Sequence, residues 1–93
     1  MSPTLRGLSR IYNSDTDDLP TVLSEYVKSD VPLVRFVALL HPLIPQKILE
    51  EAVNSASWIE RYAVANNPST PIEIKQQLSQ DSNQVVRAVA RDT

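Results

Sequence analysis

Apolar and small residues recur along the chain in two kinds of short stretch that alternate with each other. The first kind follows a proline, has apolar residues at helical spacing, and predicts helices over 20–30, 45–55 and 71–81. The second kind carries a central arginine among apolar and small residues and predicts helices over 32–41, 57–67 and 83–93. With one glycine and seven prolines, the chain suits helices separated by prolines better than β-hairpins.

The two kinds of stretch repeat with a fixed register. When "VRFVALLHPLIPQKI" (34–48) is aligned with "ERYAVANNPSTPIEI" (60–74), an arginine, two prolines and an isoleucine coincide at an offset of 26 residues. Arg87 follows at the same offset, and Arg10 lies 25 residues before the first aligned arginine. Such self-similarity is typical of a solenoid, in which stacked repeats bury a common core. We therefore predict an all-α solenoid of about three helical-hairpin repeats of 25–26 residues, forming a single domain over 1–93.

Several polar residues stand where they can cap the predicted helices. Thr70 precedes Pro71 and Glu73, and this order predicts Thr70 as the N-cap of the helix that follows. For the helices that carry an arginine, the side chains predicted as caps are Asp30, Ser55 and Asp81. Two of these helices are predicted to end just before Pro42 and Pro68, because a residue that precedes proline avoids helical backbone.

The Val-Arg pair, the Val-Ala that follows, Asn67-Pro68 and the later proline resemble the leucine-rich repeat variant family, within the HEAT/armadillo-like α-solenoids. The resemblance covers nearly the whole chain and is best over 34–90. It implies stacked helical hairpins in a right-handed superhelix, and a role in binding a partner. Two features depart from the family: the repeat is slightly longer than its usual two dozen residues, and the chain lacks the cysteine-rich iron–sulfur segment of some members.

Composition narrows the function classes. The chain has 93 residues, 42% of them apolar, a net charge of −2 and no cysteine. The charge gives no basic field for nucleic acid, and the lack of cysteine excludes disulfides, thiolate zinc sites and iron–sulfur ligation. No apolar run is long enough for a membrane span, and no apolar segment after the first residues indicates a signal peptide. We expect a cytoplasmic protein with no cofactor.

The arginines form a column with one representative in each repeat: Arg10, Arg35, Arg61 and Arg87. An apolar residue stands two positions before each arginine, and we interpret these as the most deeply buried positions: Leu8, Leu33, Ile59 and Val85. In a structural interpretation each arginine bonds a helix-end carbonyl or an acid of a neighbouring repeat, with candidates Asp30, Glu60 and Asp81. In the alternative, the arginines line a groove that binds phosphates or nucleic acid, although the net charge of −2 argues against it.

Candidate contact residues gather in the second half of the chain. Trp58 aligns with residue types that are not core formers, so Trp58 and the nearby Tyr62 are a candidate partner-binding patch. The alternative is that Trp58 folds over the start of its own helix. At the C-terminal helix, Val85, Val86 and Val89 form an apolar stripe that predicts either a partner or a homodimer through this helix.

The sequence offers few groups for catalysis. It has a single histidine and contains no nucleophile–base set, phosphate loop or nucleotide fingerprint. We therefore predict a non-catalytic interaction module that binds a protein partner or itself. Two alternatives stay open at this point: nucleic-acid or phosphate binding through the arginine column, and an enzyme or cofactor carrier of the HEAT type.

Overall fold

Six α-helices make up the part of the chain that the computed structural model describes, residues 19–92, and this part contains no strand. The helices are α2 (Leu19–Tyr26), α3 (Pro32–Leu40), α4 (Gln46–Ala52), α5 (Trp58–Asn66), α6 (Ile72–Leu78) and α7 (Gln84–Asp92). The all-α prediction is confirmed for these residues. The predictions for Leu8 and Arg10 fall outside them. Within them, no helix has the length and apolar character needed to cross a membrane.

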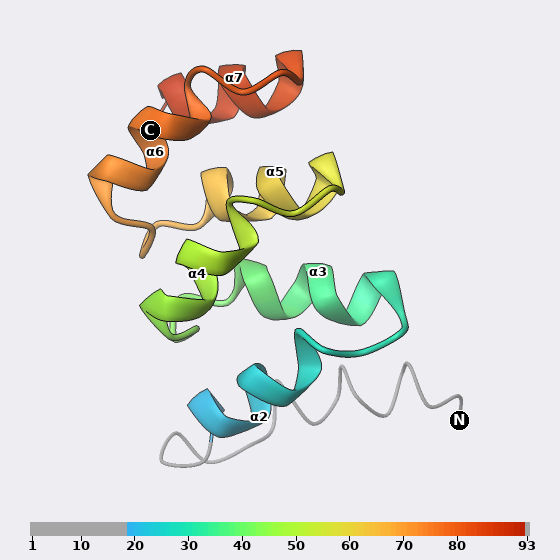
Figure 1. The fold of residues 1–93 in the computed structure, drawn as a ribbon. Helices are drawn as coiled ribbons and strands as arrows, with labels where there is room; N and C mark the ends of the chain where they lie inside the picture. The colour runs from blue at the N-terminus through green and yellow to red at the C-terminus, as the bar shows by residue number, and fades with distance from the viewer. Residues whose placement is uncertain (1–18, 93) are drawn as a thin grey trace.

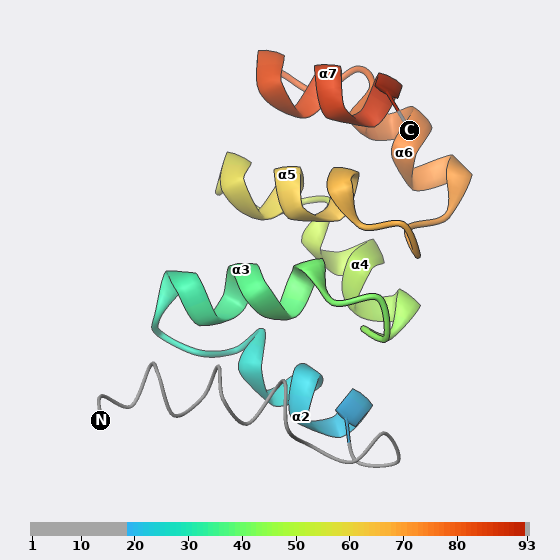
Figure 2. The ribbon, with the colours of Figure 1, turned by 180° about the vertical axis from the view of Figure 1, so that it is seen from behind.

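The helices lie in two layers. In Figures 1 and 2, α3, α5 and α7 lie side by side in one layer, while α2, α4 and α6 lie in the other. Within the first layer α5 contacts both α3 and α7, and each helix of the second layer contacts the helix that follows it in the chain. Successive helix pairs therefore repeat the same arrangement along the chain.

The core lies between these two layers. The second layer contributes large side chains, among which Leu23 and Leu49 are 0% and 1% exposed. The first layer contributes a column of small or β-branched residues at an offset of 26, all buried: Ala38, Val64 and Ala90. Leucines on one layer thus face small side chains on the other, an alternation that allows dense packing between short helices.

The helix ends follow the prolines only in part. α3 and α5 end as predicted, because His41 and Asn67 take extended backbone, with ψ angles of 133° and 122°, before a proline. The predicted start of α6 is wrong: the helix begins one residue after Pro71, and Thr70 does not cap it. The buried Thr70 hydroxyl instead donates to the Val64 carbonyl at 2.6 Å, so it satisfies an acceptor at the end of α5.

A fully buried asparagine joins the ends of α3 and α5. The Asn67 side chain is 0% exposed, and its Nδ2 donates to the carbonyls of Leu39 and His41 at 2.8 and 2.9 Å. Its Oδ1 accepts the Ser69 N–H at 2.8 Å, in the same way that Nδ1 of His41 accepts the Leu43 N–H at 3.1 Å. Asn67 therefore satisfies carbonyls at the C-terminal end of one helix from the end of its neighbour.

Replacing Asn67 with alanine is expected to destabilise the fold by about 2–3 kcal/mol, because two carbonyls and one N–H lose their buried partner. Urea unfolding followed by circular dichroism measures this difference. The matched control is Asn66→Ala, which changes the same residue type at an exposed neighbouring position. Equal stabilities of the two variants would contradict the role assigned to Asn67.

Candidate interaction surface

An arginine closes each turn that leads from the second layer into the first. In every case Nη1 donates to the carbonyl of the residue six positions earlier. The three bonds are Arg35 to Ser29 at 2.6 Å, Arg61 to Ser55 at 2.7 Å and Arg87 to Asp81 at 2.7 Å. We call these three residues the arginine ladder. Because each bond links a helix to the turn before it, the ladder fixes the angle between successive helices.

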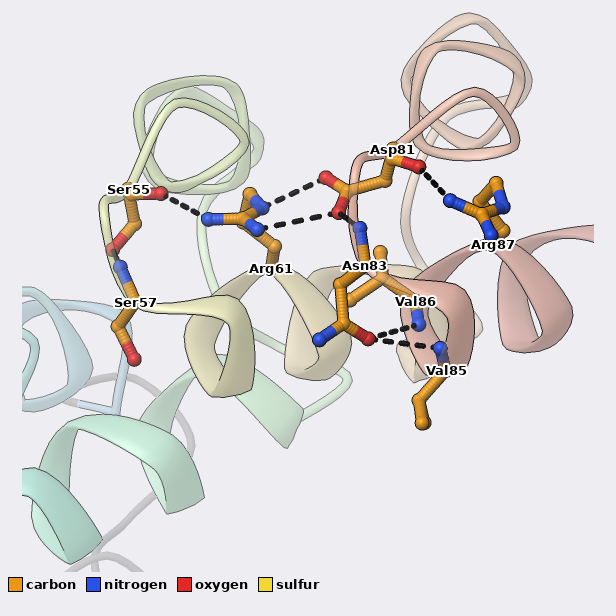
Figure 3. A network of polar contacts seen from close by, with 8 residues as sticks. All are labelled: Ser55, Ser57, Arg61, Asp81, Asn83, Val85, Val86 and Arg87. Atoms are coloured by element: carbon orange, nitrogen blue, oxygen red, sulfur yellow. Dashed lines mark hydrogen bonds and ion pairs between the residues drawn. The ribbon is translucent and has the colours of Figure 1, made fainter.

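Side chains in the same turns hold the backbone as well. Oγ of Ser29 and of Ser55 accepts the N–H two residues later at 3.1 Å, and the Asp81 carboxylate does so at 2.8 Å. Asn83 then caps α7, since its Oδ1 accepts two N–H groups of the first turn at 2.8 and 3.2 Å, as Figure 3 shows. The prediction that Asp30 caps α3 is wrong, because Val31 holds the N-cap position of α3 without a side-chain hydrogen bond.

Two of the arginines also reach an acid in the following helix pair. Nε and Nη2 of Arg61 donate to the two carboxylate oxygens of Asp81 at 2.7 and 3.2 Å, as drawn in Figure 3. Arg35 donates only through Nε, to Glu60 at 3.3 Å. The first pair is also more buried, with side chains 14% and 8% exposed against 26% and 19%. These contacts are of the structural kind, and they occupy the cations that a phosphate-binding groove would need.

The pKa of Asp81 lies below its ordinary value. Burial of the carboxyl group acts in the opposite direction and would raise the pKa. It is outweighed by the hydrogen bonds from Arg61 and from the Asn83 N–H, and by the positive charges of Arg61 and Arg87. The carboxylate form of Asp81 is therefore the form that the fold selects.

An apolar edge runs along the first layer. The second residues of α3, α5 and α7 are Leu33, Ile59 and Val85, and they are 49%, 45% and 47% exposed. The prediction that these are the most deeply buried positions is therefore wrong. In α3 and α7 the following residue is the buried one, since Val34 is 3% and Val86 is 0% exposed, whereas in α5 it is the partly buried Glu60. We call Leu33, Ile59 and Val85 the apolar edge.

Aromatic side chains adjoin the apolar edge. The rings of Phe36 and Tyr62, which hold equivalent positions in α3 and α5, stack with their centroids 6.2 Å apart and their planes at 11°. Beside them lies a hollow of about 340 Å³, lined by Phe36, Tyr62, Ile59, Val85 and Trp58. Trp58 is 42% exposed, and no lining residue carries a charge. The hollow suits an uncharged, apolar group, and its size is at the lower end for ligand pockets.

The structure separates the candidate contact residues of α7 from one another. Val85 is exposed, whereas Val86 is fully buried and Val89 is partly buried against the core. Ala90 is also buried, at 7% exposure. A stripe of three uncovered valines, on which the predicted homodimer was based, is therefore not present. Val86 belongs to the core and is not available to a partner.

The apolar edge extends the candidate surface to two residues that the sequence prediction placed in the core, Leu33 and Ile59. No signal in the sequence separated them from the buried Val34 and Val86, which lie in the same first turns of α3 and α7. Elsewhere, a hollow of about 510 Å³ is bordered by four charged residues, Lys28, Lys47, Glu51 and Glu60. Among residues 19–92 there is no group of three or more histidine or acidic side chains placed to hold a metal ion.

Comparisons of the chain with protein-family models, with curated proteins and with solved structures found no match. Assignment to a repeat family, and any role for the apolar edge, therefore depends on the geometry described above.

The two ion pairs are expected to differ in their contribution to stability. Arg61→Ala should lower the free energy of unfolding by about 2–3 kcal/mol, because it leaves the partly buried Asp81 carboxylate without its bidentate partner. Arg35→Ala should cost only about 1 kcal/mol, since that pair is longer and more exposed. Thermal and urea unfolding of both variants measure the difference. A larger loss for Arg35→Ala would contradict this ranking.

The stability contributed by Asp81 is expected to depend on pH. Because its pKa is lower in the folded chain than in the unfolded chain, the contribution is present in full at pH values well above the ordinary value of 3.8, and it is lost as the pH falls below 3.8 and through the lowered pKa of the folded chain. The difference in unfolding free energy between the natural chain and Asp81→Asn should therefore shrink between pH 6 and pH 3. Asp92→Asn, at an exposed position, is the control. A difference that stays constant over this range would rule out the linkage.

Proposed function

We propose that the protein is a non-catalytic interaction module, built as a short right-handed α-solenoid of the HEAT/armadillo-like class, and that its apolar edge binds a protein partner. The observation that carries the proposal is the apolar edge itself: three large apolar side chains at equivalent positions, each nearly half exposed. Two of them, Ile59 and Val85, line one hollow with Trp58, and exposed apolar side chains gathered in this way are typical of interaction sites, whereas single ones are ordinary.

The polar contacts support the solenoid part of the proposal. The bond from arginine to the turn carbonyl, the bond from the turn side chain to the backbone, and the position of the apolar residue all recur at an offset of 26 residues. In a solenoid each repeat contacts only its neighbours, and equivalent side chains line up along one surface. Such a surface presents the same chemistry several times to an elongated partner.

The apolar edge and the hollow together describe the partner's chemistry. The hollow beside Trp58 and Tyr62 takes an apolar side chain, and flanking apolar residues of the partner cover Leu33 and Val85. Covering the remaining exposed half of each edge residue contributes about 1 kcal/mol, on the scale of about 1.5–3 kcal/mol for a fully buried side chain. Aromatic residues such as Trp58 and Tyr62 are frequent at the centres of protein interfaces.

A capture experiment tests the proposal by comparing the natural chain with a triple variant of the apolar edge and with a double variant at other exposed apolar residues. The full chain, Leu33→Ser/Ile59→Ser/Val85→Ser, and the control Leu43→Ser/Ile72→Ser are immobilised and exposed to extract of the native cell. Leu43 and Ile72 are 48% and 61% exposed but lie outside the apolar edge. We expect the natural chain and the control to capture the same proteins, and the edge variant to lose them.

The same proteins captured by the edge variant would refute the proposed surface. Circular dichroism of each variant shows that folding is kept, which is expected because all five changes are at exposed positions. Light scattering of the purified chain distinguishes a partner from a second copy. A dimer that is lost in the edge variant would mean that the edge binds another copy of this chain.

A further inference from the structure

The three members of the arginine ladder differ in one respect. Arg35 and Arg61 use Nη1 for the turn carbonyl and also donate to a carboxylate, Arg35 through Nε alone and Arg61 through Nε and Nη2. Arg87 makes the same Nη1 bond to the Asp81 carbonyl at 2.7 Å. Within residues 19–92, however, no hydrogen-bond acceptor meets its Nε and Nη2, which are the two donors that hold Asp81 on Arg61.

We propose that the Nε–Nη2 edge of Arg87 binds a carboxylate of an acidic helical segment from another protein, which packs on α7 as α7 packs on α5. The guanidinium is already oriented by its bond to the turn, so little side-chain freedom is lost on binding. A planar pair of donors accepts a carboxylate in the two-bonded geometry that Arg61 and Asp81 show.

The surrounding charges favour an acidic partner over a second copy. α7 carries Arg87, Arg91 and Asp92, so its net charge is +1 while the whole chain is −2, and the Asp81 carboxylate near Arg87 is already held by Arg61. Arg91 is exposed at the position where Leu39 and Ala65 are buried in the preceding helices. A two-fold pairing of α7 with its copy would bring these arginines towards each other, and like charges oppose that contact.

This site is separate from the apolar edge of the proposed function. Figure 3 shows Val85 and Arg87 directed to different sides of α7, with Arg87 turned towards the Asp81 carbonyl. The same kind of contact already occurs twice within the chain. The acids that bind Arg35 and Arg61 are Glu60 and Asp81, and each belongs to the helix pair that follows in the sequence. The two proposals can therefore fail independently.

Nuclear magnetic resonance titration of the full chain tests the site. The probe is a synthetic helical peptide of glutamate, alanine and leucine, and the control peptide has glutamine in place of glutamate. We expect the glutamate peptide to shift the Nε–H signal of Arg87 while the Arg61 signal stays in place. The natural chain should bind the control peptide about tenfold more weakly than the glutamate peptide. The Arg87→Gln variant should bind the glutamate peptide about tenfold more weakly than the natural chain does. Lys47→Gln removes the same charge from an exposed position of α4 and should keep the binding.

Arg87→Lys serves as a second variant, because Arg87→Gln also removes the bond to the Asp81 carbonyl and lowers stability. It keeps the charge but lacks the paired donors, so its affinity should also fall several-fold. Equal affinities for the two peptides, or shifts confined to Ile59 and Val85, would overturn the proposal. If the chain bound a short DNA duplex more tightly than the glutamate peptide, and Arg87→Gln abolished that binding, the ligand of Arg87 would be a phosphate and the carboxylate proposal would be overturned. Concentration-dependent shifts of Arg87 without peptide would identify a second copy as the occupant.

Discussion

The bond between an arginine Nη1 and the carbonyl six residues earlier is the interaction on which the helix arrangement depends. The turns that it closes contain no glycine, and residues 19–92 include no positive φ angle. These turns therefore do not use left-handed backbone, and a side chain from the next helix holds them instead. Arginine suits this role because one arm of its rigid fork holds the turn while the other donors remain available for an acid.

The ladder also makes the two helix–helix contacts of the first layer unequal. Glu60 stands at the position that Val34 and Val86 occupy in the neighbouring helices, where those valines are 3% and 0% exposed. Its carboxylate meets Arg35 through one bond, next to the larger hollow that Ala52 also lines. At the positions that match Ala52 and Glu60 one helix pair later stand the buried apolar residues Leu78 and Val86. The contact between α5 and α7 also has the bidentate ion pair of Arg61 with Asp81. The second contact is therefore the more cohesive, and local opening is expected first between α3 and α5.

The helical character of the chain and the ends of α3 and α5 could be predicted from the sequence, because proline, arginine and apolar residues recur at a fixed spacing and local backbone preferences decide where a helix stops before proline. Which face of each helix is turned towards the core could not be predicted in this way. An apolar residue two positions before the arginine indicated the core, yet Leu33 lies about 140° from the buried Ala38 on a helical wheel, while Val34 lies about 40° from it. The wheel gives relative angles only, and both residues are apolar. Their assignment needed the second layer, whose position decides which face is covered.

Polar partners were harder to predict than helices for a similar reason. Thr70 stands at a favourable capping position by local sequence, but a buried carbonyl at the end of α5 takes its hydroxyl. Asn67 bonds residues 26 and 28 positions away, which no local pattern encodes. A side chain bonds the unsatisfied backbone group that the fold brings nearest, and such groups concentrate at the ends of these short helices.

Short helices also explain why polar and apolar functions separate onto different sides of the first layer. A nine-residue helix such as α5 completes few internal hydrogen bonds, so a large share of its backbone groups needs partners in turns. The arginines, serines and asparagines that meet this need lie on the side of the turns. The side that they leave holds Ile59, Trp58 and Tyr62, with neither charges nor obligatory backbone contacts. The need to satisfy these backbone groups thus leaves exposed apolar surface on one edge, and this is the edge on which the proposed partner docks.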